Sequence, residues 1–380
     1  MKKDPAAIRS FSPFLEERHV DLRVRAQAWV DHSNVEEDQD PRRLVKRLGR
    51  EKLLKACVPS KYGGLREQVE LRDLIVLRGV LAYRSCLLDT MFAMQGLGSY
   101  PVTLAGSDAQ RRALLPRVAS GDNICAIAIT EPEAGSDLNG ISTRAEKKGS
   151  DYLLNGIKCF ISNAGVADTY VVFARTSDDR KNGLSAFLVP RDTPGLTTKK
   201  IKLIAPHPIG FVKLTGCKLP ESARIGAEGE GTSIALGTLG FFRTSVGAAA
   251  IGMAARALEE ARVHVKKRKQ FGQPLAEFQA VQLAIAEMAL EVTAGNLLVL
   301  SAAHRTDLGG NSRSVEISMA KLYGTEAAQR VIDRAVQLHG GQGVVSGAVV
   351  ERLYREVRAL RIYEGTSEIQ KLLIARALLR

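Results

Sequence analysis

Small and hydroxylated residues gather in one short stretch, Ala128 to Asp137, which reads AITEPEAGSD. A turn of this kind exposes backbone N–H groups. Together with the hydroxyls of Thr130 and Ser136, these groups could hold a diphosphate or the polar edge of a ring system. Taken alone, such a stretch is more often an ordinary structural turn than a binding site. The residues therefore predict either a turn or a binding site for a polar ligand.

Glu364 is the carboxylate whose neighbours suggest proton transfer. A carboxylate can remove a weakly acidic proton when desolvation raises its pKa towards the operating pH. Ile362 and Tyr363 would give it mostly apolar surroundings, and Gly365 would leave room for a flat substrate. The alternative is structural, because a carboxylate near the start of the predicted helix 369–379 interacts favourably with the helix dipole.

Arg268 lies at the end of a basic run, 262–269, and is the member of that run to which we assign a function. Its guanidinium offers a fixed fork of donors to phosphate oxygens, which lysine cannot copy. We expect the lysines of the run to form a solvated helix face. The pair Gly340–Gly341 predicts the end of a helix, and paired glycines also let the backbone approach a cofactor closely.

The elements that must position these residues follow the order helices, strands, helices. Helical spacing of apolar residues, such as Leu44, Leu48, Leu53 and Leu54, extends to about residue 123 and returns after 231. Short apolar segments between 124 and 226 predict antiparallel strands. The strands are expected at 124–130, 152–160, 170–175 and 185–189, with turns at 155–156 and 182–183 and helix breaks at 272–274, 309–310 and 340–341. This order leaves crevices where a flat cofactor could lie.

The composition is that of an ordinary globular protein, with 380 residues, 45% of them hydrophobic. The weakly polar region 231–254 is cut by Arg243 and rich in small residues, so no membrane span is expected. Its run 246–250 predicts close helix packing. The first residues lack the apolar run of a secretory signal, and we expect a cytoplasmic location.

The five cysteines and six histidines are scattered along the chain, so no metal site can be assembled locally and the cysteines are expected to be buried thiols. The net charge of +13 attracts polyanions, which keeps nucleic acid open as a ligand. Against it, the basic residues are dispersed, and no zinc finger or aromatic-interleaved strand motif is present. A phosphate-rich cofactor or substrate would also use the excess charge.

Five motifs, in one order along the chain, resemble those of the acyl-CoA dehydrogenase family. The stretch 128–137 resembles the first signature of that family, and NGIKCFISNAG at 155–165 resembles the strand that faces the flavin ring. RKQFGQPL at 268–275, followed by 278–282 and 286–288, resembles the second-signature helix pair. QLHGG at 337–341 and YEGTSEIQ at 363–370 complete the set.

The resemblance implies an α+β fold in three domains. These are an N-terminal helical domain (1–123), a middle antiparallel β-barrel-like domain (124–226) and a C-terminal four-helix bundle (227–380). It also implies bound FAD and a homotetramer built from paired dimers.

The resemblance also implies roles for individual residues. One edge of the flavin would be bordered by Ile127, Ala128, Ile129, Thr130 and Ser136, and the other by Phe160, Ile161 and Ser162. The diphosphate and adenine end of FAD in a neighbouring subunit would be contacted by Arg268, Gln270, Phe278, Gln279, Gln337, Leu338, His339, Gly340 and Gly341. The FAD diphosphate region would contact Thr366, Ser367 and Glu368, and the substrate would contact Ser136, Arg243 and Gly365.

The implied activity is FAD-dependent α,β-dehydrogenation of an acyl-CoA thioester. Glu364 would take the α-proton, flavin N5 would accept the β-hydride, and an electron-transfer flavoprotein would reoxidise the cofactor. The Glu364 backbone N–H and a ribityl hydroxyl would polarise the thioester carbonyl. Family members without this base carry Glu just before the residue matching Arg243; Phe242, which cannot accept a proton, stands there.

Three positions depart from the family pattern. Phe160 replaces a frequent Trp, and Gly240 replaces the acidic partner of the CoA-binding Arg243. The loop 205–210 carries two prolines and His207, which would lie either on the surface or at the active-site mouth. Gly240 leaves open a dehydrogenase for acyl groups on a carrier protein. The charge leaves open a nucleic-acid-binding flavoprotein of the same family, against which the intact 363–366 motif argues.

Overall fold

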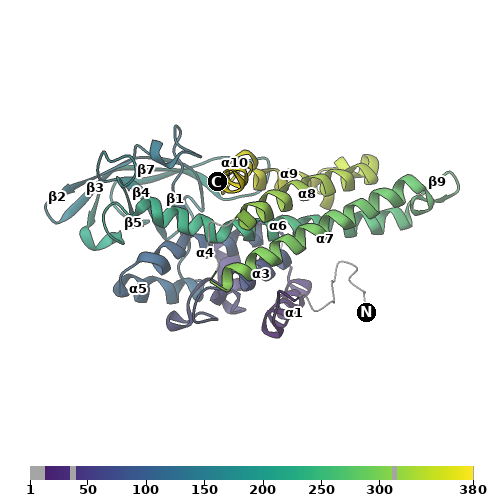
Figure 1. Ribbon diagram of the computed structural model, residues 1–380, viewed down its shortest axis with the longest axis horizontal. Helices are drawn as coiled ribbons and strands as arrows, with labels where there is room; N and C mark the ends of the chain where they lie inside the picture. Colours follow the sequence, from purple (N-terminus) through teal and green to yellow (C-terminus); the bar gives the residue numbers. More distant parts are fainter. Residues whose placement is uncertain (1–12, 35–39, 310–314, 380) are drawn as a thin grey trace. The chain divides into compact units, whose positions relative to one another are not determined.

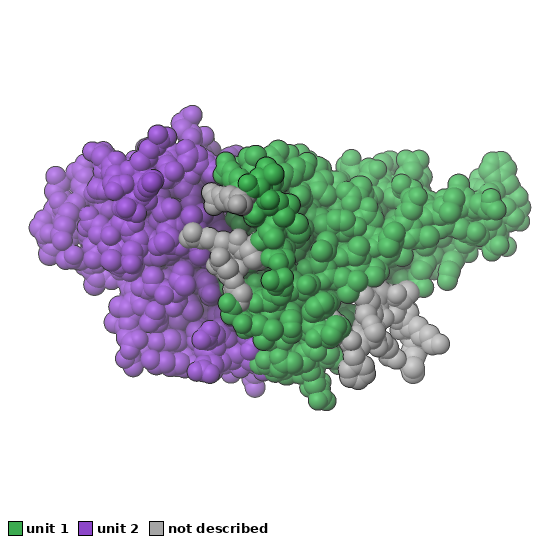
Figure 2. All heavy atoms as spheres, viewed as in Figure 1, with its two compact units in different colours: residues 1–37, 71–89, 241–380 green, residues 38–70, 90–240 purple. Residues whose placement is uncertain are grey.

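The computed structural model describes residues 13–34, 40–309 and 315–379 (Figure 1). The chain divides into two compact units, coloured separately in Figure 2. Unit 1 comprises residues 1–37, 71–89 and 241–380, and unit 2 comprises 38–70 and 90–240. The predicted order of helices, strands and helices is confirmed. The domain boundaries at 123 and 226 stay a prediction.

Unit 2 contains α2 (Pro41–Arg50), α5 (Asp108–Ala119), most of α4 (Cys86–Ala105) and the sheet. The leucines that predicted helix here, Leu44, Leu48, Leu53 and Leu54, are all buried. The last two lie in a short 3-10 helix, Leu53–Cys57. The apolar spacing therefore identified core positions correctly.

The sheet of unit 2 has the strand order β6-β7-β3-β2-β4-β5-β8, with β1 added on β4. The strands are β1 (Cys125–Ala128), β2 (Arg144–Lys148), β3 (Asp151–Ser162), β4 (Thr169–Arg175), β5 (Leu184–Pro190), β6 (Leu196–Lys200), β7 (Ile209–Pro220) and β8 (Arg224–Ile225). The prediction of antiparallel strands was wrong for β1, which pairs parallel to β4. Two-residue alternation identifies a strand but does not give its direction, because direction depends on which distant strand it meets.

The turn predicted at Asn155–Gly156 was also wrong, since both residues lie inside β3. The pairing of β3 with β7 shifts register between Leu154 and Gly156. Gly156 has φ 153°, and a Cβ there would come within 2.4 Å of the Thr143 hydroxyl oxygen. The glycine therefore permits a bulge in a continuous strand. The second predicted turn, 182–183, does lie between β4 and β5.

Unit 1 is helical. It contains α1 (Glu17–His32), α3 (Leu71–Arg84), most of α6 (Gly231–Lys267), α7 (Gln279–Asp307), α8 (Val315–His339), α9 (Val349–Val357) and α10 (Ser367–Leu378), with the hairpin β9 (Lys269–Gln270) and β10 (Gln273–Pro274). A Cβ at Gly247 would lie 2.9 Å from the Ala320 carbonyl oxygen, so α6 and α8 pass closely. This confirms the close packing predicted from 246–250.

The predicted helix breaks at 272–274 and 340–341 are confirmed by the hairpin after α6 and by the end of α8. The break at 309–310 follows the end of α7, and Gly310 lies outside the described residues. The five cysteines all lie in the described residues and form no disulfide there; four are buried and Cys86 is half-buried.

Two described helices, α6 and α7, are long and apolar enough to cross a membrane by length and composition. The most apolar part of α6 is 78% buried inside the protein and that of α7 is 33% buried. Core helices of soluble proteins satisfy the same criteria, so this is weak support for a span, and the expected lack of one stays a prediction.

Candidate functional site

The loop that carries Glu364 joins a 3-10 turn, Arg358–Arg361, to α10 in unit 1. Glu364 has φ 54° and Gly365 has φ 92°, both in the left-handed region. The N-cap of α10 is Thr366, whose hydroxyl accepts a hydrogen bond from the Ile369 N–H. The acidic residue in the first turn of α10 is Glu368. The helix-dipole role considered for Glu364 therefore falls to Glu368.

The Glu364 carboxylate combines burial with positive neighbours. Its Oε2 is buried and has no hydrogen-bond partner among the described residues. Burial raises the pKa of Glu364, while the charges of Arg78, Arg243 and Lys321 act in the opposite direction. The expected apolar surroundings were incomplete, because Ile362 is 54% exposed and cations lie close by.

Two cations and an amide hold the backbone of this loop. Arg243 Nε donates to the Glu364 carbonyl oxygen at 3.1 Å. Lys321 Nζ and Gln370 Nε2 donate to the Gly365 carbonyl oxygen at 2.8 Å and 3.0 Å. Arg243, which we expected to bind substrate, contacts the Glu364 loop, and its substrate role stays a prediction. Lys321 was not among the predicted site residues, although a lysine among the small residues of α8 is a recognisable signal.

A second group that the sequence analysis missed is a buried ion pair in unit 1. Arg78 Nε and Nη2 donate to the two carboxylate oxygens of Asp89 at 2.9 Å and 2.8 Å. Arg78 Nη1 donates to the Ser245 hydroxyl at 2.8 Å. Asp89 and Ser245 thus engage three of the five N–H groups of this arginine, and no bond to the Glu364 carboxylate is among them. Arg78 therefore acts on Glu364 through its charge.

In unit 2 the structure brings together the two strands expected to border a flavin. The Cys159 N–H donates to the Thr130 carbonyl oxygen at 2.9 Å, which joins β3 to the segment that follows β1. The side chain of Phe160 is 59% exposed, whereas Ile161 is 3% exposed. The predicted residues Ile127, Ala128 and Ile129 are buried, so they contribute mainly backbone and packing.

Ser162 is bonded to the proline-rich loop. The distance between Ser162 Oγ and His207 Nε2 is 2.8 Å. Burial lowers the pKa of His207 to about 4, so its ring is neutral near pH 7. His207 is half-buried and bonded to Ser162, so it is not a fully exposed surface side chain. Its place at an active-site mouth stays a prediction. Ser136, by contrast, is exposed.

Beneath the 128–137 stretch lies a buried ion pair that was not predicted. Lys158 Nζ donates to Glu131 Oε1 at 2.8 Å and to the Ile129 carbonyl oxygen at 3.0 Å. Glu131 also accepts from the Ser142 N–H and hydroxyl and from the Thr143 N–H. These bonds hold the turn in place from its buried side. The stretch can therefore be an ordinary structural turn and still bind a ligand on its exposed side.

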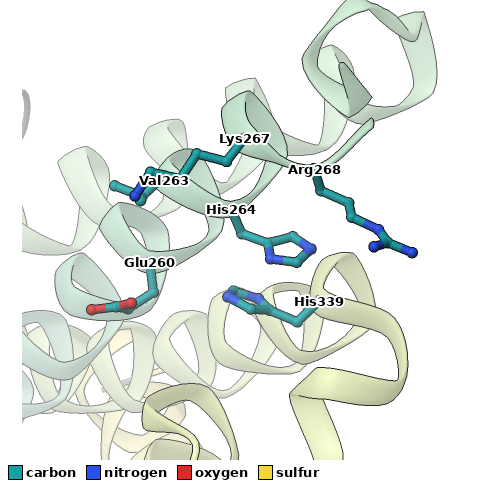
Figure 3. A pocket seen from close by; sticks show the side chains of 6 residues that line it. All are labelled: Glu260, Val263, His264, Lys267, Arg268 and His339. Atoms are coloured by element: carbon teal, nitrogen blue, oxygen red, sulfur yellow. The ribbon is translucent and has the colours of Figure 1, made fainter. Parts of the chain in front are cut away.

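Arg268 lines an open pocket at the ends of α6 and α8 in unit 1, with Glu260, Val263, His264, Lys267 and His339. Figure 3 shows the His264 and His339 rings facing each other with Arg268 beside them. The two rings are stacked with centroids 4.4 Å apart. Burial and the neighbouring charges of His339 and Arg268 lower the pKa of His264. The pocket thus presents a guanidinium suited to an anion.

The other predicted cofactor residues of unit 1 differ in what they can offer. Gln270, Gln279 and Gln337 are exposed, and Phe278 packs edge-on against Phe271. Leu338 packs against the bundle core. The Ser367 hydroxyl donates to Glu326 at 2.6 Å, so that hydrogen is already engaged, and Glu368 is exposed.

Comparison with known proteins decides the family. Models of the acyl-CoA dehydrogenase N-terminal, middle and C-terminal domains match residues 17–122, 126–214 and 229–379. An acyl-CoA dehydrogenase of Bacillus subtilis (strain 168) is 37% identical over 346 residues, which cover 90% of this chain and 91% of that protein. The chain belongs to the acyl-CoA dehydrogenase family.

Solved acyl-CoA dehydrogenases share the fold. Butyryl-CoA dehydrogenase from Megasphaera elsdenii is 31% identical, with TM-score 0.92 over 96% of this chain and 99% of that chain. A glutaryl-CoA dehydrogenase from Mycobacterium smegmatis, solved in complex with FADH2, is 29% identical, with TM-score 0.91 over 99% and 98%. These neighbours confirm the predicted fold of helical, sheet and helical domains and the prediction of an oxidoreductase.

The residues present fit the cofactor of an acyl-CoA dehydrogenase. Space is open beside the Cα atoms of Gly340 and Gly341, where a Cβ would meet nothing within 4 Å. Arg268 is exposed at the pocket edge, and Phe160 offers an exposed aromatic ring on β3. A guanidinium that can donate to phosphate, backbone open to close approach and an exposed aromatic ring are groups suited to binding a dinucleotide.

Proposed function

We propose that this protein is an FAD-dependent acyl-CoA dehydrogenase in which Glu364 is the base that removes the α-proton. The observation that carries the proposal is the Glu364 carboxylate, with its unpartnered buried oxygen. Such an oxygen is free to accept a proton. Burial raises its pKa above the ordinary value, the direction that suits a general base.

The chain's own groups account for proton transfer. Glu364 would take the α-proton of a thioester, and its backbone N–H would donate to the thioester carbonyl as negative charge develops there. The nearby cations Arg78, Arg243 and Lys321 favour the ionised carboxylate that is ready to accept the proton. Phe242 is 1% exposed and apolar, so it offers no competing base.

FAD, when bound, supplies the acceptor for the β-hydride. We assign its ring edges to residues 127–130 and 160–162, with Ser136 nearby, and its diphosphate and adenine end to Arg268, Gln270, Phe278, Gln279 and residues 337–341. Residues 366–368 would contact the diphosphate region. Arg243 and Gly365 stay assigned to the substrate side of the Glu364 loop. Electron-transfer flavoprotein would reoxidise the cofactor.

We also propose a homotetramer, which is supported by an exposed apolar face on α7. Leu283, Leu290 and Leu297 recur at seven-residue spacing and are 65%, 68% and 44% exposed in the single chain. Seven-residue spacing places side chains on one face of a helix. Large exposed apolar faces mark interaction surfaces.

The test is anaerobic bleaching of the FAD-loaded protein by a panel of thioesters with straight, branched, cyclic and aromatic acyl groups. Each is offered as the CoA and the acyl-carrier-protein thioester. One should bleach the flavin quickly. Glu364→Gln should keep the yellow cofactor and lose bleaching by about a hundredfold or more. The matched control Glu146→Gln removes an exposed carboxylate on β2 and should behave as wild type. Bleaching by Glu364→Gln at the wild-type rate would place the base elsewhere.

A further inference from the structure

We infer that Lys321 is a positioning residue that holds the Glu364–Gly365 loop and tunes the proton affinity of the Glu364 carboxylate from within α8. This inference rests on the proposed function, because it concerns the same base. Lys321 lies on α8, whereas the loop precedes α10. The rest of α8, α9 and two short 3-10 turns separate them along the chain. The loop motif itself contains no signal for it.

The geometry of Lys321 fits this role. Its side chain is fully buried, and its Nζ donates to the Gly365 carbonyl oxygen at 2.8 Å. A buried ammonium that forms a hydrogen bond to a backbone carbonyl fixes that carbonyl in direction and in distance. Glu364 and Gly365 both need an anchor, because φ values of 54° and 92° cost free energy, above all for the non-glycine residue.

Two further bonds complete the anchor. Arg243 holds the carbonyl one residue earlier, at Glu364, and Gln370 donates to the same Gly365 oxygen as Lys321. With both carbonyls directed towards these donors, the left-handed backbone is maintained. Lys321 differs from Gln370 in one respect that matters for chemistry, since it brings a positive charge to the shared acceptor.

That charge acts on Glu364 together with a small set of groups from neighbouring helices. Arg78 on α3, Arg243 on α6 and Lys321 on α8 lower the pKa of Glu364, and Asp89 on α4 raises it, all against the rise caused by burial. Burial lowers the pKa of Lys321 to about 8, an effect that Glu364, Glu326 and Glu368 oppose and Arg243 reinforces. Lys321 is therefore charged at neutral pH but close to losing its proton.

The three cations differ in the ion pairs and hydrogen bonds that they form with other groups. Arg78 is neutralised in part by its two bonds to Asp89. Lys321 forms no ion pair within the described residues, and its Nζ donates one hydrogen bond, to the Gly365 carbonyl oxygen. Arg243 also forms no ion pair among these residues, but we assign it to the substrate side of the loop. Removing the charge of Lys321 should therefore raise the pKa of Glu364 without breaking an ion pair or a substrate contact.

The experiment titrates the Glu364 carboxyl group in the FAD-loaded protein by infrared difference spectroscopy. The Glu364 band is the one that disappears in Glu364→Gln. In Lys321→Met we expect this titration to move up by about one pH unit or more, since an opposite charge within a few ångströms shifts a carboxyl pKa by roughly that amount. The acid limb of the flavin-bleaching profile should move up equally. Lys321→Arg, which keeps the charge, should titrate close to wild type.

Gln370→Met is the matched control, because it removes a neutral donor from the same carbonyl oxygen. It should slow bleaching while leaving the titration of Glu364 in place. If Lys321→Met fails to fold, Lys321→Gln tests the same charge. An unmoved Glu364 band in a folded neutral variant, or equal shifts in Lys321→Arg and Lys321→Met, would overturn the inference. The titration needs no substrate, so a shifted band with no reactive thioester would reject the proposed function alone.

Discussion

The buried pair Lys158–Glu131 in unit 2 gives the sharpest stability prediction. Lys158→Met removes a cation from Glu131 Oε1, where the contact is 2.8 Å, and a donor from the Ile129 carbonyl oxygen. The two side chains are 0% and 3% exposed, so water cannot replace the lost charge. We expect a loss of about 3 to 5 kcal/mol in the free energy of unfolding, the usual cost of leaving one buried partner uncompensated.

The pKa values of Glu131 and Lys158 show how the two charges contribute to this loss of stability. Burial acts to raise the pKa of Glu131, but Lys158, Thr143 and Ser142 together hold it at about 2, below its ordinary 4.5. Burial lowers the pKa of Lys158 to about 8, so burying the ammonium costs free energy that offsets part of the gain from the pair. Lys158→Met is costly because it leaves the Glu131 carboxylate buried without its positive partner. The stabilisation from Glu131 is fully present above pH 4.5 and is lost as the pH falls towards 2.

The assay is thermal and urea unfolding followed by circular dichroism. A loss of this size should lower the thermal midpoint by about 6 °C or more. The control Lys148→Met removes a lysine whose pair with Glu146 is exposed, and it should leave the midpoint unchanged within error. The double variant Lys158→Met/Glu131→Gln should recover part of the loss. A midpoint for Lys158→Met equal to that of Lys148→Met would refute the reasoning.

Two further predictions concern the cofactor and the assembly. Arg268→Lys should weaken FAD retention by about tenfold, because a charged fork of donors is lost. FAD content is measured after gel filtration, with Lys266→Arg as a control at an exposed lysine. An Arg268→Lys variant that keeps as much FAD as wild type and this control would contradict the assignment. Leu290→Glu should leave the chain folded, since that leucine is 68% exposed, but should shift the tetramer to smaller species in light scattering. Val24→Glu, at an exposed valine on α1, should keep the tetramer, and an unchanged mass for Leu290→Glu would count against α7 as the interface.

The spacing of apolar residues predicted most of the helices and strands, because each periodicity depends on residues that are close together in the chain. The leucines of α2, the break after α6 and the small residues of α6 were all located correctly. The strands β2, β6, β7 and β8 lie within the region 124–226 that was predicted to form strands, but no individual bounds were predicted for them. β6 is mostly exposed and β2 is rich in charge, so neither shows a strong apolar alternation.

The turn at Asn155–Gly156 shows where local reasoning fails. The dipeptide is typical of a hairpin, yet it lies inside β3, where the Asn155 side chain accepts from the Gly216 N–H at 2.7 Å. A neighbouring strand supplied bonds that made extended structure more favourable than a turn. The direction of β1 was likewise decided by its partner β4.

The sequence alone determined the order of the elements, the family motifs and Glu364 as the candidate base, since each depends on residues that are adjacent in the chain. Only the tertiary structure showed that Arg78, Arg243 and Lys321 act on that carboxylate from three helices. It also showed that Lys158 neutralises Glu131 and that His207 contacts Ser162. The physical reason is that a pKa depends on distance and burial in space, and chain separation fixes neither of them.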